Sequence, residues 1–347
     1  MAVSRFPSIA IRSNGTLWTW GILGNYSTGV GGNGNDYFSS PIQVGSSSDW
    51  TSVYGSDGFT FAKKTAGTIW GVGKNSEFQL GLPRADRSTP VQVGTDTRWI
   101  SLASPCYDTG YDMYYRGRSL AIKDDHTLWQ WGHGSGLTPT QVGTESDWSK
   151  ICGVGASTSL MAKKNDGSIW SWGDNWYGWL GHGDIVSRES PTRIGALTWL
   201  DISAGSNCYG GIRNDGTLWL WGTSYYGLLS DFKSSPVQIG SQTHWTALSI
   251  GLSLVLLRRN NGTLWSWNGT AITQIGSDST WQKIATYNGV HMAIKTNKSL
   301  WVWGDAGYGE LGKGPIASFS TPVQLGAENK WLGVAVGYGS VLGIKHI

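Results

Sequence analysis

Side chains with the chemistry for catalysis are few in this sequence and widely spread. The six histidines share no metal-ligand spacing: His126, His133, His182, His244, His291 and His346. The sequence has neither a Gly-x-Ser-x-Gly nucleophile turn nor a phosphate-binding loop. Scattered carboxylates could pair as a glycosidase dyad only through the fold. The densest group is His182 and Asp184 beside Trp179. A glycan-cleaving enzyme is therefore one alternative, but we expect no catalytic residue, no metal and no cofactor.

Aromatic side chains in polar, Gly-rich stretches suit recognition better than catalysis. Nine aromatic residues and one arginine stand out: Tyr107, Tyr111, Tyr114, Tyr115, Arg116, Trp176, Tyr177, Trp179, Tyr225 and Tyr226. Tyr, Trp and Arg among Gly, Ser and Asn are the residue types that dominate recognition surfaces. We predict that these ten residues bind a partner. The alternative is that they only pack their loops against the scaffold.

These candidate residues lie between copies of one short phrase. It reads Leu or Ile, Trp, any residue, a large hydrophobic residue (usually Trp), then Gly. The seven copies are Leu17–Gly21, Ile69–Gly73, Leu128–Gly132, Ile169–Gly173, Leu218–Gly222, Leu264–Asn268 and Leu300–Gly304. Their first tryptophans are 52, 59, 41, 49, 46 and 36 residues apart. A period of this length indicates a repeat architecture.

Each copy is flanked by the same strand and turn signals. An alternating run that ends in Lys or Arg precedes it, and in most copies a Gly preceded by Asn or Asp stands between the two, as in Asp215-Gly216. These patterns predict two antiparallel strands joined by a tight turn, with Gly216 and Gly262 in left-handed conformations. Each phrase is followed by a third run, which in most copies begins with Pro. After it, a lone Trp opens a fourth run. The sequence therefore predicts an all-β fold, a seven-bladed β-propeller of four-stranded antiparallel blades, as one domain over residues 1–347.

The two ends of the chain carry the same strand segments. Residues 2–12 align without gaps to residues 335–345. Because the Asn14-Gly15 turn ties the run before it to the first phrase, we expect the strand after Trp331 to take the innermost place in the first blade. The ring is then closed by the N- and C-terminal segments, and residues 341–347 are spare.

One element resembles a known family. The stretch from Trp172 to Gly183 fits the pattern Trp-Gly-x-Asn-x-x-Gly-x-Leu-Gly-x-Gly of the regulator-of-chromosome-condensation repeat, and weaker copies follow Gly73 and Gly304. The resemblance extends over nearly the whole chain and implies a seven-bladed propeller. The best-known member exchanges guanine nucleotide on a nuclear GTPase and binds chromatin, whereas bacterial and viral relatives are diverse. We expect this chain to be a bacterial or phage member of the family. We do not assign nucleotide-exchange activity to it, because the loop at residues 22–40 departs from the pattern.

Composition limits the partners. The net charge is +3 in 347 residues, and no run of Lys or Arg exceeds two, so we expect no nucleic-acid partner. Cys106, Cys152 and Cys208 lie far apart in the sequence and lack the spacing of a zinc site, so we interpret them as small buried residues. We find neither a signal peptide nor an apolar stretch of membrane-helix length, so no membrane insertion is expected. Localisation stays open between a virion or extracellular place and the cytoplasm.

The long connections of the predicted blades fall on one face. In such a blade the first and third connections share a face, and they include residues 22–40, 74–89, 107–118, 174–190, 223–235 and 305–321. Since binding residues concentrate on loops of rigid scaffolds, we predict a non-enzymatic module that binds a protein or a cell-surface glycan there. It would suit a phage virion appendage or an adhesin, and it could form a homo-oligomer or assemble in a larger particle. The alternatives are an intracellular exchange factor or chromatin-type adaptor, and the glycan-cleaving enzyme.

Overall fold

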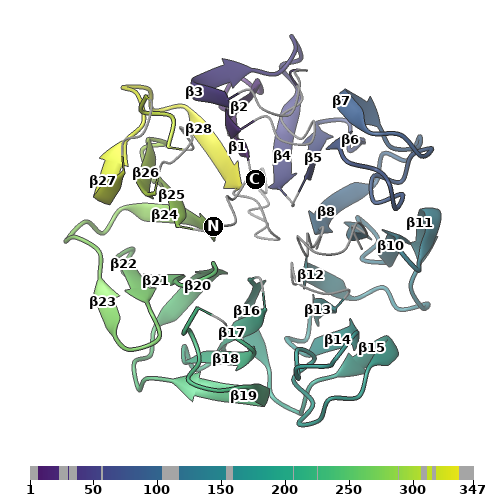
Figure 1. Ribbon diagram of the computed structural model, residues 1–347, viewed down its shortest axis with the longest axis vertical. Helices are drawn as coiled ribbons and strands as arrows, with labels where there is room; N and C mark the ends of the chain where they lie inside the picture. The colour runs from purple at the N-terminus through teal and green to yellow at the C-terminus, as the bar shows by residue number, and fades with distance from the viewer. Residues whose placement is uncertain are drawn as a thin grey trace.

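The computed structural model confirms the predicted all-β propeller. It describes residues 7–22, 30, 37–55, 58–103, 117–153, 159–205, 207–224, 226–287, 289–305, 311–314 and 318–335. Within these residues it has 28 strands and no helix. The strands form seven four-stranded antiparallel sheets, arranged as blades around a central axis (Figure 1).

Each blade contributes one strand to each of four layers. The innermost strands are β28 (Trp331–Ala335), β4 (Trp50–Gly55), β8 (Trp99–Ala103), β12 (Trp148–Gly153), β16 (Trp199–Ala204), β20 (Trp245–Ile250) and β24 (Trp281–Tyr287). The second strands are β1 (Pro7–Arg12), β5 (Phe59–Lys64), β9 (Arg118–Lys123), β13 (Leu160–Lys164), β17 (Cys208–Arg213), β21 (Val255–Arg259) and β25 (Val290–Lys295). We number the blades 1 to 7 in this order.

The outer half of each blade continues in the same order. The third strands are β2 (Leu17–Ile22), β6 (Ile69–Gly73), β10 (Leu128–Gly132), β14 (Ile169–Gly173), β18 (Leu218–Gly222), β22 (Leu264–Trp267) and β26 (Leu300–Gly304). The outermost strands are β3 (Tyr37–Gln43), β7 (Arg87–Gln92), β11 (Gly136–Gln141), β15 (Arg188–Arg193), β19 (Lys233–Ile239), β23 (Ile272–Gln274) and β27 (Phe319–Gln324). Proline occurs in six of these seven edge strands, where a missing N–H leaves no inner pairing broken.

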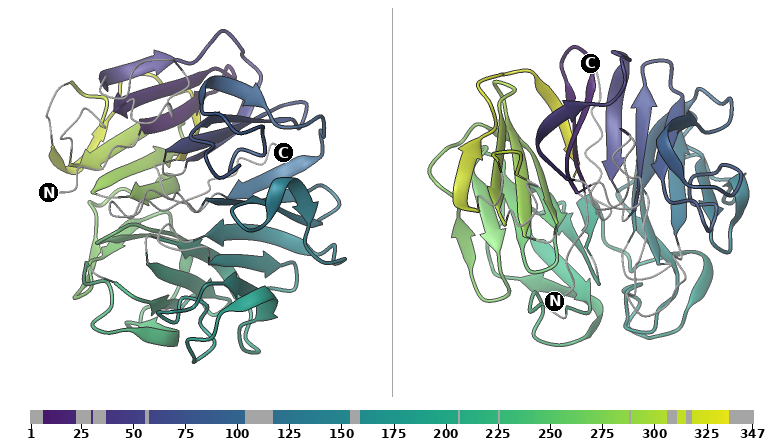
Figure 2. Two further views of the ribbon diagram at one scale, coloured as in Figure 1. Left: turned by 45° about the vertical axis from the view of Figure 1, so that its right-hand side comes forward. Right: turned by 45° about the horizontal axis from the view of Figure 1, so that its top comes forward.

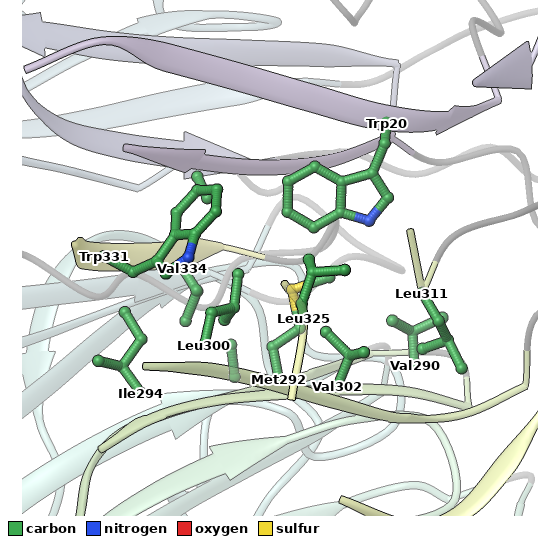
Figure 3. Packing of buried hydrophobic residues seen from close by; sticks show 12 residues of the cluster. Trp20, Val290, Met292, Ile294, Leu300, Val302, Leu311, Leu325, Trp331 and Val334 are labelled. Atoms are coloured by element: carbon green, nitrogen blue, oxygen red, sulfur yellow. The ribbon is translucent and has the colours of Figure 1, made fainter. Parts of the chain in front are cut away.

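The predicted ring closure is confirmed. Strand β28 pairs antiparallel with β1, with Ala10 opposite Val334, and blade 1 has the order β28-β1-β2-β3. At this seam Trp20 and Trp331 pack edge to face, with ring centroids 6.4 Å apart, over the apolar side chains of blade 7 (Figure 3). Residues 341–347, predicted to be spare, lie outside the described residues.

Connections gather at the two opposite ends of the strands (Figure 2). We call the end with the hairpins between second and third strands the turn face, and the other end the loop face. In the first hairpin the Gly15 N–H donates to the Arg12 carbonyl (2.9 Å) and the Arg12 N–H to the Thr16 carbonyl (3.0 Å). Three residues form this loop, and its last residue, Gly15, has φ +76°. Gly216 and Gly262 also have φ +79°, as predicted.

A polar chain repeats at every hairpin of the turn face. The Nε1 of the first phrase tryptophan donates to a Thr or Ser hydroxyl two residues earlier, at 2.8–3.1 Å in all seven blades. In six blades that hydroxyl donates in turn to an Asn or Asp side chain. Blade 2 has Ala66 at the equivalent position. The turn chemistry therefore orients the tryptophan that follows it.

Candidate binding surface on the loop face

A buried asparagine organises the loop between β14 and β15. The Asn175 side chain is fully buried; its Nδ2 donates to the carbonyls of Asp184 and Val186 at 3.1 Å, and its Oδ1 accepts the Leu180 N–H at 2.9 Å. Asn75 does the same between β6 and β7, where Leu80 N–H is 3.0 Å from its Oδ1. Because one buried side chain satisfies three backbone groups, it fixes the path of a long loop without regular structure.

The same loops are held against the following blade. Trp221 Nε1 of blade 5 donates to the Trp179 carbonyl of blade 4 at 3.0 Å, and Trp131 Nε1 of blade 3 donates to the Gln79 carbonyl of blade 2 at 3.0 Å. A Cβ at Gly181 would lie 2.7 Å from Trp221 Nε1, so only glycine allows this approach. The Asn, Leu and Gly positions of the motif thus build a rigid support for the residues between them.

An exposed apolar patch lies on two loops of the loop face. From the β14–β15 loop come Trp176, Tyr177, Ile185 and Val186, and from the β18–β19 loop come Tyr226 and Phe232. The fraction exposed is 67% for Trp176 and 57% for Tyr226. These six residues, which we call the loop-face patch, are the majority of the ten exposed large hydrophobic residues in the described part of the chain. Such clusters mark interaction sites on soluble proteins.

The two loops of the patch contact each other directly. The Gly183 N–H donates to the Ser234 carbonyl at 2.7 Å, and the Thr223 hydroxyl lies 3.5 Å from the Tyr177 carbonyl. A Cβ at Gly178 would lie 2.9 Å from Phe232 Cε2, which places this ring against the neighbouring loop. The patch therefore spans two adjacent blades on fixed backbones.

Polar groups beneath the patch are already engaged. Arg188 donates two hydrogen bonds to Asp184, at 2.8 and 3.0 Å, and these bonds lower the pKa of Asp184 to about 2. The Nε2 of His182 lies 3.0 Å from the Ser171 hydroxyl; burial, and then the positive charge of Arg188, lower the pKa of His182 to about 4. His182 is thus neutral at pH 7 and Asp184 is held by Arg188, an arrangement that suits loop structure better than proton transfer.

The structure separates the predicted binding residues into three groups. Trp176, Tyr177 and Tyr226 are exposed and lie on the two contacting loops. Trp179 is only 6% exposed and packs in the core between blades 4 and 5, so we do not retain it as a binding residue. The remaining six residues lie outside the described part of the chain: Tyr107, Tyr111, Tyr114, Tyr115, Arg116 and Tyr225.

Three members of the patch were not predicted from the sequence. Ile185, Val186 and Phe232 are apolar residues inside otherwise polar loops, next to Asp184, Ser187, Asp231 and Lys233. That contrast between an apolar residue and its polar neighbours is a signal in the sequence, but a criterion based on aromatic clusters overlooks it.

Cysteine nucleophiles and metal ligands are not assembled in the described part of the chain. Cys152 and Cys208 are buried free thiols, and burial raises the pKa of each to about 12, so neither acts as a nucleophile. Among the described residues no three His, Cys, Asp or Glu side chains converge as a metal site. The same residues also include no helix with the length and apolar character to cross a bilayer.

Comparison with known proteins agrees with this architecture. Residues 166–209, which include Asn175 and its loop, match the model of the regulator of chromosome condensation (RCC1) repeat. The structure of human WBSCR16 is similar with a TM-score of 0.79 and 16% identity over 96% of this chain and 97% of that one. Prp20p from Saccharomyces cerevisiae, which binds Gsp1p and histones, is similar with a TM-score of 0.73 and 14% identity over 94% and 87%. At these identities the structural likeness shows the shared fold.

Proposed function

We propose that this chain is a non-catalytic module that binds a protein partner through the loop-face patch. The observation that supports this proposal most strongly is the exposure of six large apolar residues on two held loops: Asn175 and Trp221 hold the β14–β15 backbone, and Trp267 Nε1 donates to the Leu228 carbonyl of the β18–β19 loop at 3.0 Å. A preorganised apolar surface binds with little loss of conformational entropy. Its aromatic members are the residue types that dominate binding energy in protein interfaces.

A protein fits the patch better than a glycan. Ile185 and Val186 present neither an aromatic face for a sugar ring nor a side-chain hydrogen-bonding group, yet they are exposed on the same loop as Trp176. Aliphatic side chains of this kind gain free energy when an apolar partner surface covers them. The adhesin and virion-appendage hypotheses rest on composition alone.

A small GTPase is the first partner class to test. The resemblance to the regulator-of-chromosome-condensation family implies a GTPase partner, and the similar Prp20p binds Gsp1p. We extend a GTPase partner to this chain as a proposal, because the RCC1 repeat match includes the β14–β15 loop of the patch. Nucleotide exchange would be a consequence of such binding and is measured separately.

Site-specific crosslinking tests the proposed surface. A photoreactive amino acid at position 226 is expected to capture the partner from a panel of purified small GTPases or from the native source. The same amino acid at Asp124, which is exposed on the turn face, is the matched control. Crosslinking from position 124 but not from 226 would contradict the face assignment, and retention on a glycan array would favour the glycan alternative.

Substitution then measures the contribution of the patch. Trp176→Ala with Tyr226→Ala is expected to weaken the captured complex about thirtyfold or more, because a single interface anchor contributes about 2 kcal/mol. The melting temperature stays unchanged, since both side chains are exposed. Tyr114→Ala with Tyr115→Ala, measured in the same way, tests whether the β8–β9 connection belongs to the same site.

A further inference from the structure

Every blade holds one cation between two tryptophans on the turn face. The cation is the last residue of the second strand. One tryptophan is the first residue of the innermost strand, and the other is the first tryptophan of the phrase. The seven cations are Arg12, Lys64, Lys123, Lys164, Arg213, Arg259 and Lys295, each with its Nζ or Cζ 3.3–5.3 Å from two ring centroids. Cation–π contact accounts for the basic residue at this position in all seven repeats.

Five of these cations also have a carboxylate from the linker that enters their blade. The N–O distances are 2.6–3.2 Å for Lys295–Asp278, Lys123–Asp96, Lys164–Glu145, Lys64–Asp49 and Arg12–Glu328. In four of the five pairs the acid stands three residues before the innermost tryptophan. The fold therefore has a recurrent place for a carboxylate beside the sandwiched cation.

Blades 5 and 6 depart from this rule. The residues three before Trp199 and Trp245 are Ala196 and Gln242, and neither linker contains an acid. Neither Arg213 nor Arg259 has an ion pair within the described residues, and the Nε atom of each is buried without a hydrogen-bond partner there. Asp215, in the hairpin beside Arg213, attracts this guanidinium through space but forms no ion pair with it, and it accepts hydrogen bonds from Thr217, at 2.6 Å from the Thr217 hydroxyl.

Two further features of this region favour a particular partner. Leu197 and Leu200, in the linker and the first strand of blade 5, are 50% and 46% exposed. Nearby, the carboxylate of Asp201 interacts with Lys150, Lys163 and Arg258, so three cations surround one acid. Positive charge in excess beside exposed leucines suits an acidic peptide with apolar side chains more than a free inorganic anion.

We propose that the turn face of blades 5 and 6 binds an acidic peptide segment of a partner protein. Its carboxylates take the places beside Arg213 and Arg259 that Asp96 and Asp278 take in other blades, and its apolar side chains cover Leu197 and Leu200. Arginine suits these two places because its guanidinium stacks on indole and pairs with carboxylate in a bidentate way. This surface is independent of the loop-face patch, so either proposal can fail alone.

Fluorescence anisotropy with a labelled probe tests the proposal. The probe is a twelve-residue peptide of alternating Glu and Leu, added to the full-length protein at low ionic strength, where charge attraction is least screened. Arg213→Gln with Arg259→Gln is expected to weaken binding about tenfold or more, since each lost charge-assisted pair accounts for about threefold to tenfold. Arg98→Gln is the matched control, because it removes an exposed cation on the same face that already pairs with Asp125.

A gain of charge on the protein provides the second test. Gln242→Glu with Ala196→Glu supplies the missing carboxylates from the chain itself and should abolish peptide binding while the melting temperature holds or rises. Binding that survives this change, or that weakens equally in Arg98→Gln, overturns the proposal. Failure of the wild-type protein to bind the peptide also overturns it. Equal binding of single-stranded DNA of the same charge would show a general polyanion surface instead.

Discussion

The two faces of the propeller differ in what they repeat. On the turn face, hairpin, hydroxyl, tryptophan and cation recur in all seven blades, and the distance from the tryptophan Nε1 to the hydroxyl stays within 2.8–3.1 Å. On the loop face, the connections between third and outermost strands range from three residues in blade 3 to fourteen in blades 1, 4 and 7. The difference indicates that the stability of each blade is built at the repeated end, and that the varied end is available for recognition.

Departures from the repeat within each face also indicate where a function could lie. On the turn face the cation lacks a linker acid only in blades 5 and 6, and among the described loops of the loop face, those of blades 4 and 5 carry the exposed large apolar side chains. Both departures involve blade 5. A repeat that changes in one place has lost a structural constraint there or has gained a functional one, and experiments on both faces can separate these cases.

Removal of residues 331–347 should have the largest effect. It deletes β28, exposes Ala10 and Trp20 at the seam, and leaves blade 1 with an open innermost edge (Figure 3). Burial of Trp331 and Val334 alone accounts for several kcal/mol, a large part of the roughly 5–15 kcal/mol that stabilises a typical domain. We expect unfolded protein or a melting temperature lower by many degrees. Unchanged melting would show that the ring does not need this strand.

Acid should weaken the loop face before the turn face. Burial lowers the pKa of His291 to about 4, and its Nδ1 lies 2.6 Å from the Thr286 hydroxyl near the loop-face end of β25. The unfolded chain binds this proton near pH 6.5, so the stability is complete above pH 6.5 and is lost as the pH falls towards 4. The loss approaches about 3 kcal/mol for this histidine. His182 acts in the same direction.

On the turn face, Asp166 and Asp215 lose their negative charge only at lower pH. Hydrogen bonds from Ser168 and Thr217 lower the pKa of Asp166 and of Asp215, so their contribution is present above about pH 4 and is lost only below it. Urea unfolding at pH 7.0 and 5.0 measures the difference, and His291→Leu should flatten it. If that variant keeps the full pH dependence, another group is responsible.

Most of the fold was predictable because its signals are local and repeated seven times. Tryptophan, proline and turn glycines mark strand order directly, and the strand that closes the ring followed from the likeness of the two ends. Which loop-face side chains are buried was harder to predict from the sequence. Trp179 and Trp176 are both tryptophans in the same Gly-rich stretch of sequence. The backbone carbonyl of Trp179, however, accepts a hydrogen bond from Trp221 Nε1, and the Trp179 ring lies in the core. Charge pairing between linker and strand likewise depends on how consecutive blades meet.

A single turn glycine gives the next largest effect. Gly216 has φ +79°, and an added Cβ would lie 2.5 Å from the His244 backbone nitrogen. We expect Gly216→Ala to cost about 2 kcal/mol, from the left-handed backbone together with the clash, as measured by thermal unfolding. Gly227→Ala on the loop face is the comparison: it has φ +84° but nothing within 4 Å of the added Cβ, so only the backbone cost remains. Equal losses would show that the contact between the Gly216 turn and the following linker contributes nothing.

The smallest expected effect is a gain of stability on the turn face of blade 2. Thr68 donates no hydrogen bond to a turn side chain there because Ala66 replaces the Asn or Asp of the other six blades. Ala66→Asn should supply an oxygen that accepts bonds from the Thr68 N–H and hydroxyl, as Asn14 does for Thr16 at 3.2 and 2.7 Å. We expect about 0.5–1 kcal/mol of added stability in denaturant unfolding. In a Thr68→Val background the hydroxyl is absent, so the gain should fall by about half; a gain that is unchanged there would show that asparagine acts through the turn backbone and not through the chain that ends at Trp70.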